Sequence, residues 1–231
     1  MTITKKDSDQ SAAAQRGRGR PQLRSDEETR AIIVETARHE FAASGYAATS
    51  MENVARSAGV STKTLYRLIP NKAALFEAMV TERIDRLASV VRLRACKGGD
   101  IEAALTDALI AFAELILDGE VIALQRMILA ESGKFPEIAE TFYHKAIRRT
   151  EDTLAGWLRA QQARGLIEFD DATAAAGLLL GMLIFQPQRA VMFGQKPPPS
   201  REDIERRAKA CAVLFLQGCG RGGLRPPPAT P

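Results

Sequence analysis

The sequence predicts an all-α fold with a small N-terminal helical unit and a larger helical body. Apolar residues recur at spacings of three and four through most of the 231 residues, which is the period of an amphipathic helix. Glycine and proline stand where these periodic stretches stop. The apolar fraction of 45% is normal for a soluble globular protein, and the length allows one large domain plus a small one.

Composition and cysteine spacing argue against several other classes. The three cysteines and two histidines are scattered, without zinc-ligand spacing or a disulfide framework, so we expect a reduced cytoplasmic protein with no metal and no cofactor. No Ser/His/Asp set or phosphate-binding loop is present, so we expect no enzyme. The N-terminus lacks a hydrophobic signal region. The longest apolar run, residues 172–185, is shorter than the roughly 20 residues that span a bilayer, so no membrane partner is expected.

Residues 1–24 are predicted to form a disordered basic arm. The tetrapeptide Arg18-Gly-Arg-Pro21 resembles the core of an AT-hook, whose arginines enter narrow A·T-rich minor grooves. The alternative is a basic tail that adds only non-specific affinity, and four residues leave both open. Either interpretation favours DNA as a partner, because clustered arginines attract phosphates.

The first helix is predicted over residues 26–44. Ser25 is placed as its N-cap, and three acidic residues follow in the first turn, where the helix dipole favours negative charge. Gly45 is expected to end the helix.

The stretch 49–67 predicts a helix-turn-helix, beginning with a short first helix. Thr49 or Ser50 can cap this helix, and Gly59 can end it in the left-handed backbone conformation. Its apolar stripe consists of Met51, Val54, Ala55 and Ala58. An ordinary helical hairpin would use the same turn chemistry and is the alternative at this point.

The second helix of the motif is predicted to be the one that reads DNA. Ser61 or Thr62 caps it, and Leu65 anchors it in the core. The outward residues are of types that bond phosphates and base edges: Thr62, Lys63, Thr64, Tyr66 and Arg67.

Residues 72–217 are predicted to form the body, and residues 218–231 a disordered Gly/Pro-rich tail. A long helix from Pro136 to about Arg164 is expected to stop before Gly165. The helix that follows Asp171 is apolar around nearly its whole circumference, and Pro187 is expected to kink or end it. The other helices are expected at 71–95, 100–117, 120–132 and 201–217.

The N-terminal unit resembles the DNA-binding domain of the Tet repressor (TetR) family over residues 25–76. The matching residues are Arg30-Ala-Ile-Ile, Ala37, Phe41, Gly45-Tyr46, Thr49, Val54-Ala55, Ala58-Gly-Val-Ser61, Thr64-Leu-Tyr66, Lys72 and Leu75. The resemblance implies a three-helix DNA-binding domain (residues 25–71) and a helical ligand-binding and dimerisation domain (residues 72–217). It also implies a homodimer that binds a pseudo-palindromic operator in double-stranded DNA and is released by a small hydrophobic effector.

The resemblance suggests individual roles. Thr49 and Ser50 match phosphate-holding positions, and Lys72 matches a lysine that usually meets the DNA backbone. Lys63 departs from the family pattern and adds a possible contact to guanine or phosphate, while Leu68-Ile69 replace an aromatic-containing pair. The full set of predicted DNA-binding residues is Arg18, Arg20, Thr49, Ser50, Ser61, Thr62, Lys63, Thr64, Tyr66, Arg67 and Lys72.

For the body, the resemblance places the helix after Asp171 in both the subunit interface and the pocket wall. The predicted ligand-binding residues are Phe112, Met127, Phe142, Trp157, Met182 and Phe185, although aromatic residues and methionines on apolar helix faces usually belong to the core. An alternative function is an architectural or non-specific DNA-binding protein built around the minor-groove arm. A body of this size argues against that alternative, because such binders need no second domain.

Overall fold

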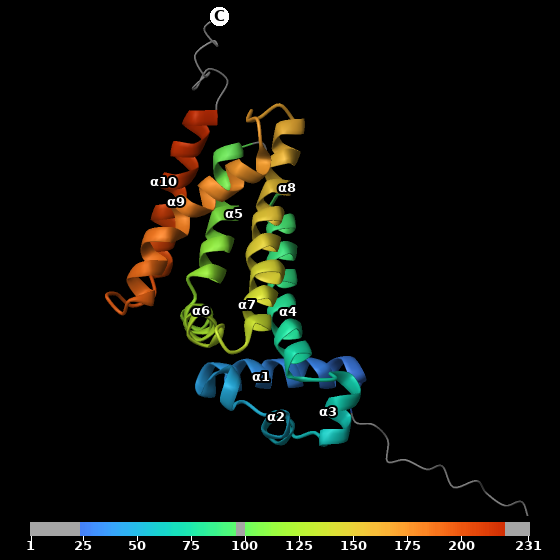
Figure 1. Cartoon of the computed structure of the whole chain (residues 1–231). Coiled ribbons are helices and arrows are strands. Elements are labelled where there is room, and N and C mark those ends of the chain that lie inside the picture. Colours follow the sequence, from blue (N-terminus) through green and yellow to red (C-terminus); the bar gives the residue numbers. More distant parts are fainter. Residues whose placement is uncertain (1–23, 96–99, 220–231) are drawn as a thin grey trace, which may run out of the picture.

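A computed structural model describes residues 24–95 and 100–219, and within these ranges the regular structure is helical throughout. The helices form a small head, α1 to α3, and a larger body that stands on it (Figure 1). Helix α1 lies across the foot of α4, which rises from the head into the body (Figure 1). The predicted all-α fold, with a helix-turn-helix unit followed by a helical domain, is confirmed.

The head helices are α1 (Asp26–Ala48), α2 (Met51–Ser57) and α3 (Thr62–Leu68). Ser25 caps α1 in a reciprocal capping box with Glu28, as its side chain accepts from the Glu28 N–H while Glu28 accepts from the Ser25 N–H. The Ser50 and Ser61 side chains cap α2 and α3 in the same way, each accepting from the N–H three residues later. The predicted helix starts therefore hold, and serine supplies the cap at each one.

The predicted end of the first helix at Gly45 corresponds to a sharp kink. Gly45 has φ +80° and ψ 172°, and a short helical turn continues from Tyr46 to Ala48. This backbone region is essentially restricted to glycine. The kink turns Tyr46 into the core, where its ring stacks on Phe41 at 5.6 Å between centroids and meets Phe76 and Phe135 edge-on. Burial raises the pKa of Tyr46 to about 12, with the nearby Glu137 carboxylate contributing.

The body begins with the long helix α4, whose first turn is capped by the Asn71 side chain. Tyr143–Arg148 forms a π-helical turn, η1, between α7 and α8. The body elements are α4 (Lys72–Ala95), α5 (Ile101–Ile116), α6 (Gly119–Glu131), α7 (Pro136–Phe142), η1 (Tyr143–Arg148), α8 (Arg149–Ala163), α9 (Ala172–Met192) and α10 (Arg201–Cys219). The predicted single α-helix from Pro136 to about Arg164 is therefore corrected, because a π turn interrupts it.

Pro187 was expected to kink or end its helix, and α9 does not end there but continues to Met192. Proline has no N–H for the carbonyl four residues earlier, which here belongs to Leu183. The Arg207 guanidinium on α10 supplies the missing donor, at 2.6 Å from the Leu183 oxygen and 2.7 Å from the Met182 oxygen. The helix therefore passes the proline because a neighbouring helix satisfies the carbonyl.

At 21 residues, α9 is long and apolar enough to cross a bilayer by length and composition alone. The sequence estimate of a shorter apolar segment is corrected because the helix runs beyond Phe185. Its inner face lies in the body core with α5, α8 and α10, where residues such as Leu179 and Leu183 have no exposed surface. Such a helix is equally typical of a soluble protein's core, and the relatives described below favour that interpretation.

The kink at Gly45 generates the first prediction. A Cβ added there would lie 2.5 Å from a Glu131 carboxylate oxygen, whereas one added at Gly59, at φ +67°, meets nothing within 4 Å. Gly59→Ala is expected to cost about 1 kcal/mol of unfolding free energy from backbone strain alone. Gly45→Ala is expected to cost about 2–4 kcal/mol, because a more restricted backbone and a displaced carboxylate add to the strain.

Urea denaturation of the two variants measures the difference directly. Equal losses would show that the Glu131 carboxylate moves aside without cost and would contradict the tight junction.

Candidate nucleic-acid interface and effector cavity

Helix α3 presents most of the predicted DNA-reading residues to solvent. Leu65 is fully buried and anchors the helix, while Thr64 is half-buried. The remaining predicted residues are exposed: Ser61, Thr62, Lys63, Tyr66 and Arg67. One short helix therefore brings hydroxyl, ammonium, phenol and guanidinium groups onto one surface, which suits phosphate and base-edge contacts.

Several of these side chains already have partners. The Ser61 hydroxyl accepts from the Thr64 N–H at 3.0 Å and lies 2.8 Å from the Thr64 hydroxyl. The Tyr66 hydroxyl donates to Glu52 at 3.2 Å, and desolvation together with this carboxylate raises the pKa of Tyr66. The Tyr66 ring is still 43% exposed. Tyr66 is therefore positioned by α2 while its face remains open to a partner.

Arg67 joins the reader helix to the start of α1. Its guanidinium donates to both oxygens of Asp26, at 2.6 and 2.7 Å, and this hydrogen bonding raises the pKa of Arg67. A bidentate pair of this kind fixes orientation as well as distance. The geometry therefore favours a positioning role for Arg67 in addition to any contact with DNA.

Two predicted phosphate contacts are engaged inside the head. Thr49 is 2% exposed, and its hydroxyl lies 2.7 Å from the Gly45 carbonyl oxygen and 3.2 Å from that of Glu40. The Lys72 ammonium donates to the carbonyls of Tyr46, Ala47 and Thr49 at 2.8, 3.3 and 3.0 Å. Both side chains hold the segment after the kink, so the geometry assigns them to the scaffold. The Ser50 hydroxyl is used as the α2 cap.

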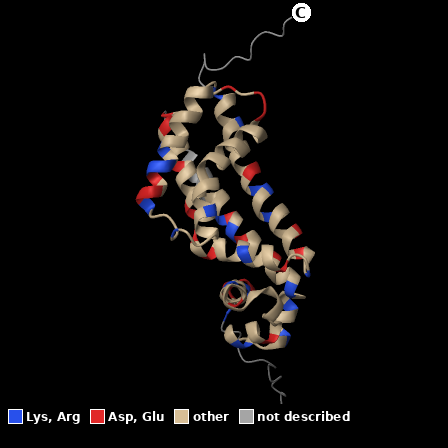
Figure 2. Cartoon of the chain, turned by 60° about the vertical axis from the view of Figure 1, so that its left-hand side comes forward, with Lys and Arg blue, Asp and Glu red and all other residues tan. Residues whose placement is uncertain are grey.

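The predicted arm residues Arg18 and Arg20 lie outside the described residues, as does most of the tail at 218–231. The described head carries both signs of charge, and basic and acidic residues are also interspersed along the body helices (Figure 2). In the described part of the chain, the DNA-facing charge therefore depends on individual residues such as Lys63.

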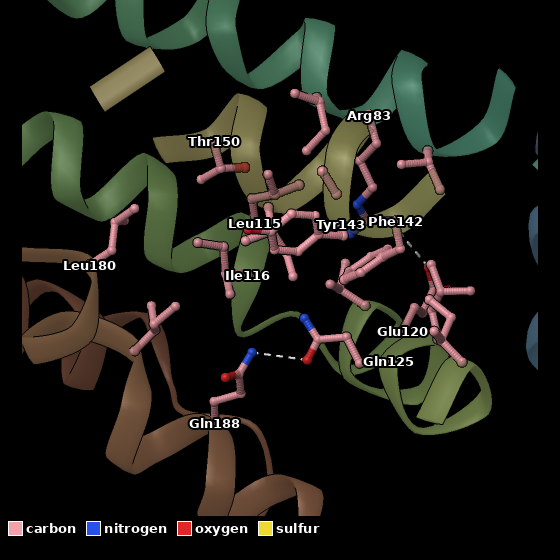
Figure 3. A pocket seen from close by; sticks show the side chains of 18 of the residues that line it. Arg83, Leu115, Ile116, Glu120, Gln125, Phe142, Tyr143, Thr150, Leu180 and Gln188 are labelled. Atoms are coloured by element: carbon pink, nitrogen blue, oxygen red, sulfur yellow. Dashed lines mark hydrogen bonds and ion pairs between the residues drawn. The ribbon is translucent and has the colours of Figure 1, made fainter. Parts of the chain in front are cut away.

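A cavity of about 690 Å³ lies between the head and the body helices. Its walls are mostly apolar and come from α1, α4, α5, α6, α7, η1, α8 and α9, and Figure 3 shows Leu115, Ile116, Phe142 and Leu180 around it. This volume is in the range of small-molecule sites. The α1 residues Arg38 and Ala42 belong to the wall, so the cavity touches the DNA-binding head itself.

Two of the six predicted ligand-binding residues, Phe142 and Phe185, line this cavity. Phe112 and Trp157 are buried in the body core, away from the cavity wall. Met127 packs against the cluster shared by the head and the lower body, and Met182 is exposed on the outer face of α9. The sequence identified helices that line the cavity. Which residues of each helix face the cavity depends on how the helices are rotated against each other, and the sequence does not show this.

The polar cavity residues were missed by the sequence analysis. Arg38 and Arg83 from the head side both pair with Glu120, and Arg83 also contacts Asp118 at 2.8 Å. Gln188 on α9 donates to Gln125 on α6 at 2.9 Å (Figure 3). Glutamine and arginine are common on solvated helix faces, so only the three-dimensional packing distinguishes these side chains.

Helix α6 connects the cavity wall to the head at both of its ends. At the first end, Glu120 pairs with Arg38 of α1. At the second, the Glu131 carboxylate accepts from the Tyr46 N–H at 3.0 Å and from the Ala47 N–H at 2.7 Å. A displacement of α6 therefore acts directly on α1 and on the kink that leads into α2.

Comparison with known proteins gives matches over both parts of the chain. A model described as bacterial regulatory proteins of the tetR family matches residues 33–79, and a model for the C-terminal domain of AefR-like transcriptional repressors matches residues 103–219. The transcriptional repressor ComR of Escherichia coli K12 is 30% identical over 163 residues, covering 69% of this chain and 75% of ComR.

Solved structures show the same fold. A protein of Mesorhizobium loti MAFF303099 assigned to the TetR family has 29% identity and a TM-score of 0.72, over 83% of this chain and 96% of that one. The flavonoid-responsive regulator FrrA has 30% identity and a TM-score of 0.63, over 85% of this chain and 100% of its own.

The fold, the exposed reader helix and these similarities define a helix-turn-helix transcriptional regulator. More particularly, the chain belongs to the TetR family of bacterial regulators.

The reader surface generates the second prediction. Lys63 is exposed and has no ion-pair partner among the described residues, so Lys63→Ala removes a charge without disturbing the head. We expect operator affinity to fall about tenfold in a fluorescence-anisotropy titration, as for a lost base or phosphate contact. If affinity falls for every DNA sequence and depends less on salt, Lys63 contacts a phosphate. If affinity falls only at sites with one particular base pair, Lys63 contacts a guanine.

Lys196→Ala is the matched control, because Lys196 is an exposed lysine in the loop between α9 and α10. It is expected to leave affinity unchanged. Wild-type affinity in Lys63→Ala would remove Lys63 from the interface.

Proposed function

We propose that the protein is a cytoplasmic, dimeric repressor that binds a pseudo-palindromic operator and is released from it by a small apolar effector. The observation that carries the effector-release part is the position of the cavity, whose wall includes Arg38 and Ala42 of the DNA-binding head. A molecule in this space contacts α1, α4 and α6 together. If the head and body are arranged differently in two conformations, the molecule makes different contacts in each. It therefore binds them with different affinities, which is what a shift in their populations requires.

We propose that DNA is contacted by the exposed side chains of α3 and by the residues just before that helix. Lys63 and Tyr66 are exposed, and Thr62 and Ser61 stand at the N-terminus of the helix, where backbone N–H groups favour phosphate. Arg67 and Ser50 contribute from positions already fixed within the head. The printed name of ComR, a transcriptional repressor, supports repression as the direction of control.

For the dimer, we propose a second copy of the chain on the outer face of α9 and α10. Leu178 is 71% exposed and Leu214 is 62% exposed, with Met182 and Phe185 on the same α9 face. Gly177 and Gly181, which also line the cavity, stand beside this face, and a Cβ added at either would meet nothing within 4 Å. An apolar surface of this kind on a soluble regulator fits a four-helix interface between two subunits.

The alternative, an architectural DNA-binding protein, depends on the Arg18–Pro21 arm alone. The described residues favour the regulator, because an architectural binder has no use for a cavity that touches its DNA-binding head.

The test of the proposed function is selection of binding sites from a random duplex library, followed by footprinting. We expect an inverted repeat whose half-sites lie about 34–36 Å apart, one helical turn, because a symmetric dimer places its two heads in successive major grooves. Recovery of sequences without a shared motif would favour the architectural alternative.

The dimer face generates the third prediction. Leu178→Glu places a charge on the exposed α9 face without touching the cavity wall, and we expect a monomer in light scattering. Because one head then binds alone, the affinity for the full repeat should approach that for a half-site. Leu166→Glu, at an exposed leucine outside α9 and α10, should stay dimeric. A dimeric Leu178→Glu variant would place the interface elsewhere.

The junction between α6 and the head generates the fourth prediction. Glu131→Gln keeps the side-chain shape but turns an amide donor toward one of the two N–H groups of Tyr46 and Ala47. We expect a loss of about 1–3 kcal/mol in unfolding free energy and faster hydrogen exchange at these two amides. Glu140→Gln, at an exposed glutamate on α7, is the control. Unchanged exchange at Ala47 would show that α6 does not hold the kink.

A further inference from the structure

Thr150 is a largely buried residue whose hydroxyl is unpaired among the described residues yet still accessible. Thr150 is only 6% exposed and lines the cavity, yet its hydroxyl makes no hydrogen bond within the described part of the chain. Thr36 and Thr153, also in helices, donate to the carbonyl four residues earlier at 2.8 and 2.7 Å. The Thr150 hydroxyl lacks this internal bond, so its donor and acceptor capacity is left to water or another molecule in the cavity.

The π turn explains why Thr150 lacks this bond. The carbonyl four residues before it belongs to Ala146, which lies inside η1. In a π-helix the hydrogen-bond register is five residues, so this carbonyl is not placed as it would be in an α-helix. The Thr150 side chain stands at the wall beside Leu115 with its oxygen directed inward (Figure 3). The π turn therefore leaves a hydrogen-bonding group available to a ligand.

The Gln125–Gln188 pair supplies further neutral hydrogen-bonding capacity on another wall of the same cavity (Figure 3). One N–H group of Gln188 and the carbonyl oxygen of Gln125 are used in their mutual bond. The Gln188 carbonyl and the Gln125 amino group have no other partner among the described residues. The pair therefore still offers the Gln188 carbonyl as an acceptor and the Gln125 amino group as a donor.

The charged groups of the cavity largely neutralise one another. Arg38 contacts Glu35 at 2.5 Å and also pairs with Glu120, while Arg83 pairs with Asp118 and Glu120. An anionic ligand would compete with Glu35, Asp118 and Glu120 for guanidinium groups whose charge these carboxylates already balance.

Glu151 is the one cavity-lining carboxylate without an ion-pair partner among the described residues. It is half-exposed and can stay hydrated, so it requires no cationic ligand. The buried polar groups of the cavity thus favour neutral hydrogen bonding.

We infer that the cavity binds an uncharged, largely apolar molecule that carries a hydroxyl or carbonyl group, recognised by Thr150 and the Gln125–Gln188 pair. The inference deepens the proposed effector site and rests on it. The apolar walls provide most of the affinity, while the neutral polar groups select the chemistry. A ligand that enters between Gln125 and Gln188 also replaces the bond that joins α6 to α9.

The test uses four probes with one ring system: pyrene, pyrenemethanol, pyrenecarboxylate and pyrenemethylammonium. Binding to the full-length protein is followed by pyrene fluorescence without DNA, so it is independent of operator recognition. We expect pyrenemethanol to bind about three- to tenfold more tightly than pyrene, and both charged probes to bind at least about tenfold more weakly than the alcohol.

Variants then locate the recognition. Thr150→Val should remove the preference for pyrenemethanol over pyrene, and Thr150→Ser should restore it. Thr153→Val, a matched deletion on the same helix, should leave the preference intact, because the Thr153 hydroxyl bonds within the helix. Ile116→Trp fills part of the cavity and should weaken all four probes.

Tighter binding of the carboxylate would overturn the inference in favour of the arginines, and tighter binding of the ammonium would overturn it in favour of Glu151. An alcohol preference that persists in Thr150→Val, or binding unchanged by Ile116→Trp, would overturn the site. None of these results changes the expected outcome of operator selection and footprinting. Failure of the ligand class is therefore distinguishable from failure of the proposed regulator.

Discussion

The structure depends on how five residues, Gly45 to Thr49, are held between head and body. Their N–H groups at Tyr46 and Ala47 face the Glu131 carboxylate of α6, and their carbonyls face the Lys72 ammonium at the start of α4. Opposite charges thus satisfy the two sides of one short backbone segment, where an unpaired group would be costly. Because these charges belong to two body helices, the segment fixes the orientation of α2 and α3 relative to both of them.

This arrangement links the cavity to the reader helix without a long chain of contacts. The middle of α6 lines the cavity, its first turn pairs with Arg38, and its last residue holds the kink. Bonds from α3 to α1 and from Tyr66 to Glu52 then make the head one rigid unit. In the proposed dimer, a small movement of α6 would rotate the surface of α3 as a whole, and two heads on a fixed operator spacing would be sensitive to that rotation.

The local signals in the sequence were sufficient for the head. Ser25, Ser50 and Ser61 cap helices as expected because capping depends only on neighbouring residues, and Gly45 and Gly59 have positive φ for the same local reason. Thr49 and Lys72 were predicted to contact DNA from the family resemblance, which does not show that their polar atoms are also bonded within the protein; their DNA contacts stay predictions. Pro187 was expected to kink or end its helix; the helix does not end there, because Arg207 from another helix donates to the carbonyl that the proline leaves without a partner. The π turn has no sequence signature, so the free Thr150 hydroxyl was not predictable.

In the proposed dimer, the two faces of α9 would connect ligand binding to association of subunits. Gly177, Gly181 and Phe185 line the cavity, while Leu178 and Met182 are exposed on neighbouring positions of the same helix. Glycines at the boundary leave the cavity wall only one backbone thick, so a second subunit packed on α9 would stand close to the ligand. Packing there would exclude water from the exposed part of Phe185 and strengthen every hydrogen bond made by Gln188 on the same helix. Ligand affinity and subunit association should then be thermodynamically linked, each favouring the other in the arrangement that seals the cavity.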